Sequence, residues 1–108
     1  MARRLIRGDV YLCRFTPPDK QRPVLVITCH AAIDHLNTIT VAPITSTIRG
    51  VPSEVLLNTE DGMKGTCAIN LHNLVTLSQD RLVRRVTSLS TERMQEVCVA
   101  IRFSLGCG

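Results

Sequence analysis

The sequence predicts a mainly β protein with a C-terminal helix, folded as a small barrel or curled sheet on which the helix packs. Five strand-like segments and two shorter β-prone pieces follow one another through the first 87 residues, with turn residues between them. The apolar spacing then becomes helical after Ser90. With 108 residues in all, we expect residues 1–108 to form a single domain.

The expected strands are rich in β-branched and aromatic residues. The first, 9–15, has apolar residues at odd and even positions, so both of its faces are expected to be covered. Pro23 has no N–H to lose, so it opens a central strand at 23–29. Pro43 indicates an edge or a bulge near the end of the third strand, 38–45. The other strand-like segments are 53–57, 66–71, 74–77 and 84–87.

The last segment has the spacing of an amphipathic helix. Its apolar residues recur at short intervals that place them on one helical face. Ser90 is the expected N-cap, Glu92 lies near the positive end of the helix dipole, and Gly106 ends the helix. The predicted apolar face consists of Met94, Val97, Cys98, Ile101 and Leu105.

The net charge of +4 is unevenly distributed along the chain. Residues 1–22 hold six basic and two acidic side chains (+4), residues 23–80 two and five (−3), and residues 81–108 five and two (+3). If the two ends share a face, they form a basic surface suited to phosphates. Only three aromatic residues are present, so any nucleic-acid binding must rely on charge and hydrogen bonds rather than on stacked bases.

The longest apolar runs are far shorter than the roughly 20 residues that cross a bilayer. No apolar segment follows the basic start as a secretory signal requires, so we expect a cytoplasmic protein that does not enter a membrane. The five cysteines include no CxxC pair, which favours neither a disulfide framework nor a zinc site. Four of them lie in apolar segments and are expected to be buried free thiols: Cys13, Cys29, Cys67 and Cys98.

The three histidines, His30, His35 and His72, lack the spacing of a metal site, so no metal or cofactor is expected. Their ordinary interpretation is as solvated or locally hydrogen-bonded side chains. A histidine pair converging on one phosphate, as in some nucleases, is the alternative.

Arg22 precedes Pro23, which restricts it to extended backbone geometry and so projects its guanidinium in a fixed direction. A planar cation held in this way suits bidentate binding of a phosphate and of the charge that develops on it. The alternative is a solvated residue at the end of a strand.

Three consecutive hydroxyl side chains, Thr45, Ser46 and Thr47, follow the third strand and precede Arg49. They form either an ordinary turn, with side chains bonded to the local backbone, or a pocket of hydroxyls and a cation for a phosphodiester. If the third strand lies beside the second, Thr45 and Arg22 can face one groove.

Three blocks of sequence resemble MazF/PemK-type toxins, the endoribonuclease half of a bacterial toxin–antitoxin pair. The first is Arg-Gly-Asp-Val-Tyr-Leu at 7–12 with Arg-Pro-Val-Leu-Val-Ile at 22–27, and the second is Thr-Val-Ala-Pro-Ile-Thr-Ser-Thr at 40–47 with Arg-Gly at 49–50. The third runs from Asn-Leu-His-Asn-Leu-Val at 70–75 to Met94. The resemblance extends over residues 7–105.

The resemblance implies a small SH3-like β-barrel, as in MazF, PemK and CcdB, that forms a homodimer and cuts single-stranded RNA without a metal or cofactor. Arg22 corresponds to the catalytic arginine and Thr45 to the catalytic threonine. The implied reaction is attack by the neighbouring 2′-hydroxyl, which leaves a 2′,3′-cyclic phosphate and a 5′-hydroxyl. The implied RNA-binding positions are Asp19, Lys20, Ser46, Thr47, Arg49 and Asn73.

Two departures from the family pattern are clear. The loop 16–21 is short and lacks the usual glutamate, which leaves Asp19 as its only acid, and Val75 replaces an arginine that many members carry. A basic RNA groove is best silenced by an acidic, partly disordered segment, so we expect a MazE-like antitoxin as partner.

Two other functions stay open. One is a non-catalytic RNA-binding barrel. The other is a gyrase-binding toxin of the CcdB type, although such proteins end in Trp-Gly and this chain has no tryptophan.

Overall fold

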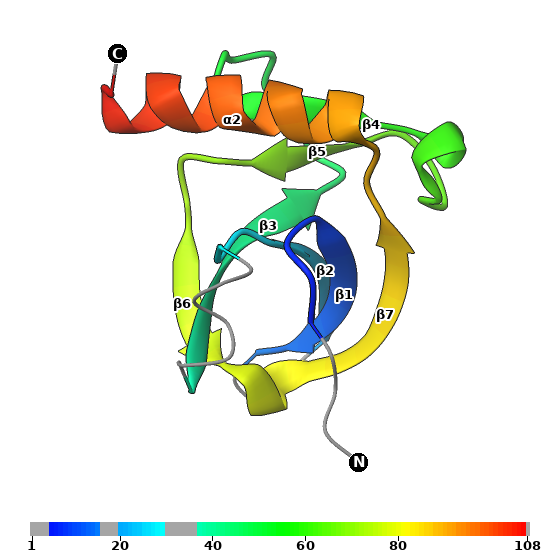
Figure 1. The fold of residues 1–108 in the computed structure, drawn as a ribbon. Coiled ribbons are helices and arrows are strands. Elements are labelled where there is room, and N and C mark those ends of the chain that lie inside the picture. The colour runs from blue at the N-terminus through cyan, green and yellow to red at the C-terminus, as the bar shows by residue number, and fades with distance from the viewer. Residues whose placement is uncertain (1–4, 16–19, 30–36, 108) are drawn as a thin grey trace.

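The computed structural model describes residues 5–15, 20–29 and 37–107, and within these ranges the protein is mainly β with a C-terminal helix, as predicted (Figure 1). The strands are β1 (Asp9–Arg14), β2 (Gln21–Val26), β3 (Thr38–Thr45), β4 (Glu54–Leu57), β5 (Cys67–Asn70), β6 (Val75–Ser78) and β7 (Leu82–Ser88). Two 3₁₀ turns, η1 (Thr59–Asp61) and η2 (Gln79–Arg81), precede β5 and β7, and helix α2 (Thr91–Leu105) follows. None of the helices in the described ranges has the length and hydropathy needed to cross a membrane.

All seven strands pair antiparallel in one sheet. The order along the sheet is β4-β5-β3-β2-β1-β7, and β6 pairs with β3 as well. The sheet curls around its own core, and α2 lies across one end of the curl (Figure 1). Within the described residues β7 pairs with neither β6 nor β4, so the sheet stays open where a barrel would close.

Strand β3 has partners on both sides, so it is not an edge strand as a whole, but its pairing on one side is interrupted at Pro43, where an edge or a bulge was expected. One side of β3 pairs with β2, while the other pairs with β6 up to Val41 and with β5 from Ile44 onward. Pro43 therefore lies in the two-residue gap between β6 and β5, where no ladder on that side requires its missing N–H.

Strand β2 begins two residues earlier than predicted, at Gln21, and Pro23 is its third residue. Pro23 pairs with Leu12 of β1, while the recorded pairing of β2 with β3 starts only at Val24. The strand ends at Val26, so residues 27–29 are not part of it. Because Arg22 now belongs to a strand, its position is fixed by pairing as well as by the following proline.

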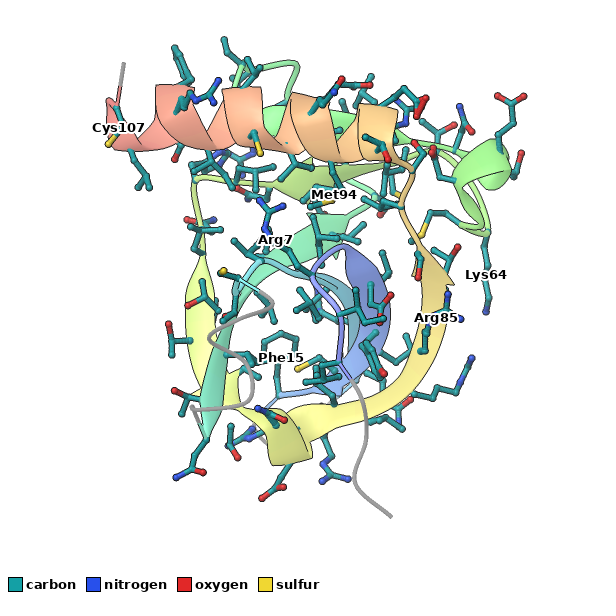
Figure 2. All side chains as sticks on the ribbon, viewed as in Figure 1. Arg7, Phe15, Lys64, Arg85, Met94 and Cys107 are labelled. Carbon is teal, nitrogen blue, oxygen red and sulfur yellow. The ribbon has the colours of Figure 1, made fainter. Side chains whose placement is uncertain are left out.

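Two apolar cores cover the two faces of the sheet. One lies between the sheet and α2, and the other lies inside the curl. Val10 contributes to the first core, whereas Tyr11 and Cys13 contribute to the second, which confirms that β1 is covered on both faces. In Figure 2, Met94 points from α2 toward the first core and Phe15 lies inside the curl.

Helix α2 has the predicted caps. The Ser90 hydroxyl accepts a hydrogen bond from the N–H of Arg93, and Gly106 ends the helix in the left-handed conformation. The apolar face was predicted correctly except at its end. Val97 and Ala100 are fully buried, but Leu105 is 59% exposed because the last turn extends beyond the sheet.

The cysteines are free thiols, as expected. Cys13 and Cys67 are buried and Cys98 is partly buried, but Cys29 is exposed because β2 ends before it. His30 and His35 lie outside the described residues.

Candidate active site

Arg22 and Thr45 lie level with each other at the ends of neighbouring strands. In the antiparallel register Val24 of β2 faces Pro43 of β3. Arg22 and Thr45 each lie two residues beyond this last pair, toward the same end of the two strands. The condition set by the sequence, that the second and third strands be neighbours, is thus met.

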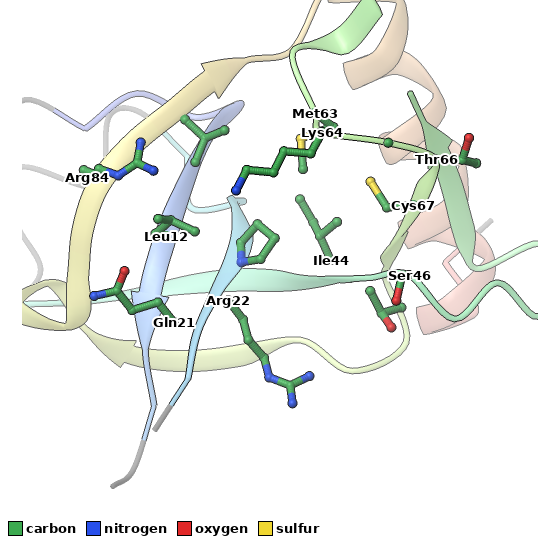
Figure 3. A pocket seen from close by; sticks show the side chains of 14 residues that line it. Leu12, Gln21, Arg22, Ile44, Ser46, Met63, Lys64, Thr66, Cys67 and Arg84 are labelled. Carbon is green, nitrogen blue, oxygen red and sulfur yellow. The ribbon is translucent and has the colours of Figure 1, made fainter. Parts of the chain in front are cut away.

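Arg22 and Thr45 line one cavity of about 620 Å³ (Figure 3). The cavity lies over β7, β1, β2 and the end of β3, and the segment between η1 and β5 forms its opposite wall. Its size is that of a small-ligand or nucleotide site. The polar side chains that line it are those of Gln21, Arg22, Thr45, Ser46, Lys64, Thr66, Cys67 and Arg84.

The cavity is positively charged. Three of its lining residues are cationic, and none of the described lining residues is Asp, Glu or His. The cations come from both basic ends of the chain, since Arg22 belongs to residues 1–22 and Arg84 to residues 81–108. The two ends therefore share a face, and that face favours an anion.

The Thr45 hydroxyl is oriented by its own turn. The N–H of Thr47 donates a hydrogen bond of 3.0 Å to Thr45 Oγ1. The local turn chemistry considered in the sequence is thus present, but it uses the hydroxyl only as an acceptor. The proton of Thr45 stays available for donation to a ligand, since a hydroxyl is one donor and two acceptors.

Cys67 forms part of the wall as a neutral group. Burial, and next the negative charge of Asp61, raise the pKa of the Cys67 thiol above its ordinary value. At neutral pH the side chain is therefore a thiol, which adds no negative charge against a phosphate. The cavity offers donors and cations, and its described residues offer no ordinary general base.

The structure brings together only part of the residues singled out in the sequence. Ser46 lines the cavity with Arg22 and Thr45. Lys20 and Asn73 are exposed and do not line it, and Asp19 lies outside the described residues. Thr47 serves as the backbone donor to Thr45.

Arg49 lies beside the cavity without lining it, in a turn organised by Glu54. The Glu54 carboxylate accepts hydrogen bonds from the backbone N–H groups of Arg49 and Gly50, at 2.8–3.2 Å. This contact uses the backbone of Arg49 and leaves its guanidinium exposed, without a described side-chain partner.

Sequence reasoning missed five polar residues of the cavity: Gln21, Lys64, Thr66, Cys67 and Arg84. Lys64 was the one detectable case, because it and Arg49 are the only basic residues in an otherwise acidic stretch, 23–80. Gln21 and Arg84 come from strands whose place relative to β3 no local pattern reveals.

His72, the one histidine within the described residues, lies apart from the cavity. Its Nδ1 is 2.5 Å from the hydroxyl of Ser53, a buried residue. No group of three or more His, Cys, Asp or Glu side chains gathers as a metal site in the described ranges.

The fold and the cavity define a small, mainly β protein with a cationic cavity built on a strand pair. The chain matches the family model of PemK-like, MazF-like toxins of type II toxin–antitoxin systems over residues 6–105, and it belongs to this family.

Among curated proteins, the chain is 37% identical to the probable endoribonuclease MazF5 of Mycobacterium tuberculosis, covering 94% of this chain and 93% of that protein. It is 35% identical to the probable endoribonuclease MazF2 of the same species, covering 94% and 98%. Among solved structures, it is similar to M. tuberculosis toxin MazF-mt6, with a TM-score of 0.85, 27% identity and coverage of 93% and 98%.

Another similar structure is an endoribonuclease in complex with its cognate antitoxin from a mycobacterial species. Its TM-score is 0.87 and its identity 25%, and the match covers 96% of this chain and 97% of that one.

Proposed function

We propose that this protein is the toxin of a type II toxin–antitoxin pair and cleaves single-stranded RNA with Arg22 and Thr45. The observation that carries the proposal is the placement of these two side chains, level on neighbouring strands, in a cavity whose described lining is cationic. The family and the relatives named endoribonuclease support the same reaction.

The proposed reaction is an in-line attack by the 2′-hydroxyl on the adjacent phosphorus. The new O–P bond forms as the bond to the 5′-oxygen breaks, which leaves a 2′,3′-cyclic phosphate and a 5′-hydroxyl. The Arg22 guanidinium stabilises the charge on the phosphorane, and the Thr45 hydroxyl donates to a non-bridging oxygen. Arg22 is a poor base because its pKa exceeds about 12, so another group takes the proton of the 2′-hydroxyl.

Asp19 is the proposed candidate for that proton transfer, as the only acid in loop 16–21. No metal or cofactor takes part in the proposed reaction. The protein then acts in the cytoplasm, where its substrate is, and no membrane is involved.

The proposed partner is an acidic MazE-like antitoxin. Its carboxylates can occupy the same cationic cavity and block it, and a segment that is disordered when free can be degraded readily. The mycobacterial relative solved with its cognate antitoxin supports this partnership.

We further propose a homodimer, and we assign the curled sheet to the small SH3-like barrels. The apolar run 24–27 is covered within the protomer, because residues 24–26 are buried and Ile27 packs against the first core. The most exposed large apolar residues lie on α2, where Val99 and Phe103 are 62% and 60% exposed. A second copy that covers this face supports the dimer.

Arg22→Ala tests the catalytic assignment. The purified variant, incubated with RNA and EDTA, should cleave about 10²–10³-fold more slowly than the parent, the loss typical of removing one such donor. Its stability should stay within about 0.5 kcal/mol, because Arg22 is exposed. Arg22→Lys should recover only part of the rate, since a point charge lacks the guanidinium fork. Thr45→Val tests the hydroxyl in the same assay, and mapping of 5′-hydroxyl ends tests the chemistry.

A folded Arg22→Ala protein with parental turnover would contradict the role of Arg22. RNA binding by the parent without cleavage would instead identify a non-catalytic RNA-binding barrel, and gyrase-dependent DNA breaks would identify a CcdB-type toxin.

A further inference from the structure

Lys64 and Arg84 line the cavity beside the proposed catalytic pair, and no role has been assigned to either of them. We propose that these two side chains bind phosphates adjacent to the scissile one, so that the cavity is a track for successive phosphates of a single strand. The proposal rests on the proposed RNA substrate.

The cations are spread along the cavity rather than gathered at one point. Arg84 of β7 faces Leu12 of β1, and Leu12 in turn faces Pro23, the neighbour of Arg22. Arg84 and Arg22 thus lie on strands two apart, roughly 10 Å at the backbone. In Figure 3 the Lys64 side chain reaches over β1 and β2 toward Leu12, Arg84 lies on β7, and the Arg22 guanidinium points away from both. One phosphate at Arg22 does not satisfy all three cations.

The three cations have no partner among the protein groups that the structure describes. Within the described residues, the side chains of Arg22, Lys64 and Arg84 make no hydrogen bond or ion pair. Arg85, the next residue on β7, differs: its Nε lies 3.6 Å from the buried carboxylate of Asp9, and its Nη2 donates a 2.6 Å hydrogen bond to Ser88. Arg85 therefore makes structural contacts, whereas the charge of the adjacent Arg84 remains available to a ligand.

The segment that presents Lys64 is held in place by three contacts. Asp61 and Asn58 form a capping box around η1. Arg93 of α2 binds both carboxylate oxygens of Asp61, at 3.0 and 3.2 Å, and the Thr87 hydroxyl donates to the Asp61 carbonyl. These contacts fix the backbone from which Lys64 extends (Figure 2). A cation on a fixed backbone loses less freedom when it binds.

The salt dependence of binding tests this assignment directly. For single strands the slope of log K against log [salt] changes by about 0.7 for each phosphate neutralised. The probe is a fluorescein-labelled single-stranded oligodeoxynucleotide of mixed sequence, which lacks the 2′-hydroxyl and is not cleaved by the proposed reaction. Its anisotropy is measured over a series of KCl concentrations.

Lys64→Gln and Arg84→Gln should each make the slope shallower by about 0.7, and the double variant by about 1.4. Lys64→Arg, which keeps the charge, should retain the parental slope. Arg102→Gln is the matched control, because it removes an exposed cation of α2 that does not line the cavity and should leave the slope unchanged. On cleavable RNA, the two single variants should raise KM severalfold and change kcat much less than Arg22→Ala does.

A parental salt slope in Lys64→Gln or in Arg84→Gln overturns the assignment of that residue. If Arg102→Gln makes the slope shallower by the same amount, the phosphate track as a whole is overturned. These outcomes are independent of the proposed function, which fails if the parent does not cleave RNA at all.

Discussion

Asp61 shows how a single carboxylate connects the helix to the cavity wall. Burial by itself would raise its pKa, but the hydrogen bonds from Arg93 and from the N–H of Asn58, with the charge of Arg93, together hold the pKa of Asp61 below its usual value of 3.8. The same contacts raise the pKa of Arg93. Arg93 and Asp61 therefore form a charged pair, in which the Asp61 side chain is only 10% exposed.

This lowered pKa predicts how stability depends on pH. A depressed carboxyl pKa contributes stability that is fully present above 3.8, the usual value, and is lost as the pH falls through the folded-state pKa. Asp61→Asn should lower the free energy of unfolding by about 1–3 kcal/mol at pH 7, because it breaks charge-assisted hydrogen bonds. The difference from the parent should shrink below pH 3.8. Urea titrations of the parent and of Asp61→Asn at several pH values measure this difference in the free energy of unfolding.

Glu60→Gln is the control for this pH experiment, because it removes an adjacent charge whose side chain has no described hydrogen bond or ion pair. If the loss of unfolding free energy in Asp61→Asn stays constant down to the lowest accessible pH, the lowered pKa of Asp61 does not contribute to stability as proposed.

At the scale of elements, Gly62 decides how closely the η1 turn approaches β7. Its φ of +93° lies in the left-handed region that favours glycine. A Cβ at this position would also lie 2.4 Å from the Thr87 hydroxyl oxygen, much closer than any allowed contact. Both facts follow from the docking of the turn on β7, and together they explain why no other residue fits there without a shift.

Gly62→Ala should therefore destabilise the protein by about 1–3 kcal/mol, the range for a strained backbone position. Gly65, in the same segment, has no such φ and no heavy atom within 4 Å of an added Cβ, so Gly65→Ala should stay within about 0.5 kcal/mol of the parent. Thermal melts of the two variants provide the comparison. Equal melting temperatures would show that the turn is not constrained as described.

The sequence predicted the individual strands and the helix better than it predicted which of them lie side by side. The bounds of β3 and the two caps of α2 were correct because hydroxyls, glycines and apolar periods act locally. The predicted burial of Leu105 was wrong because it depends on which element lies alongside the last turn of α2. The sequence likewise could not decide between an edge and a bulge at Pro43. For the same reason Arg22 and Thr45 were identified from their own motifs, whereas Arg84 needed the register of β7 on β1.

At the scale of the whole molecule, the charge pattern predicted a shared basic face, and β1 brings this about by pairing with both β2 and β7. The quaternary structure could not be predicted from the same pattern. The apolar run 24–27, which a second copy could in principle cover, is instead covered by the two cores of one protomer. The exposed apolar residues of α2 became apparent only once the helix was placed on the sheet.

Sedimentation equilibrium tests the proposed dimer. At micromolar concentration we expect a mass of twice 11.9 kDa, since α2 leaves Val99 and Phe103 mostly exposed in a single protomer. Phe103→Asp should shift the equilibrium toward the monomer while leaving the fold intact. A parent that sediments only at 11.9 kDa would exclude the dimer at that concentration.

Strand β3, which pairs with β2, β5 and β6, has a consequence for the order of events during folding. Its partners come from before and after it in the chain, so loops must close in both directions before Thr45 reaches its place beside Ala68. Such non-local topologies fold in milliseconds to seconds rather than microseconds. The proposed catalytic geometry therefore arises only with the complete sheet, so we expect a nascent or partly unfolded chain not to cleave RNA.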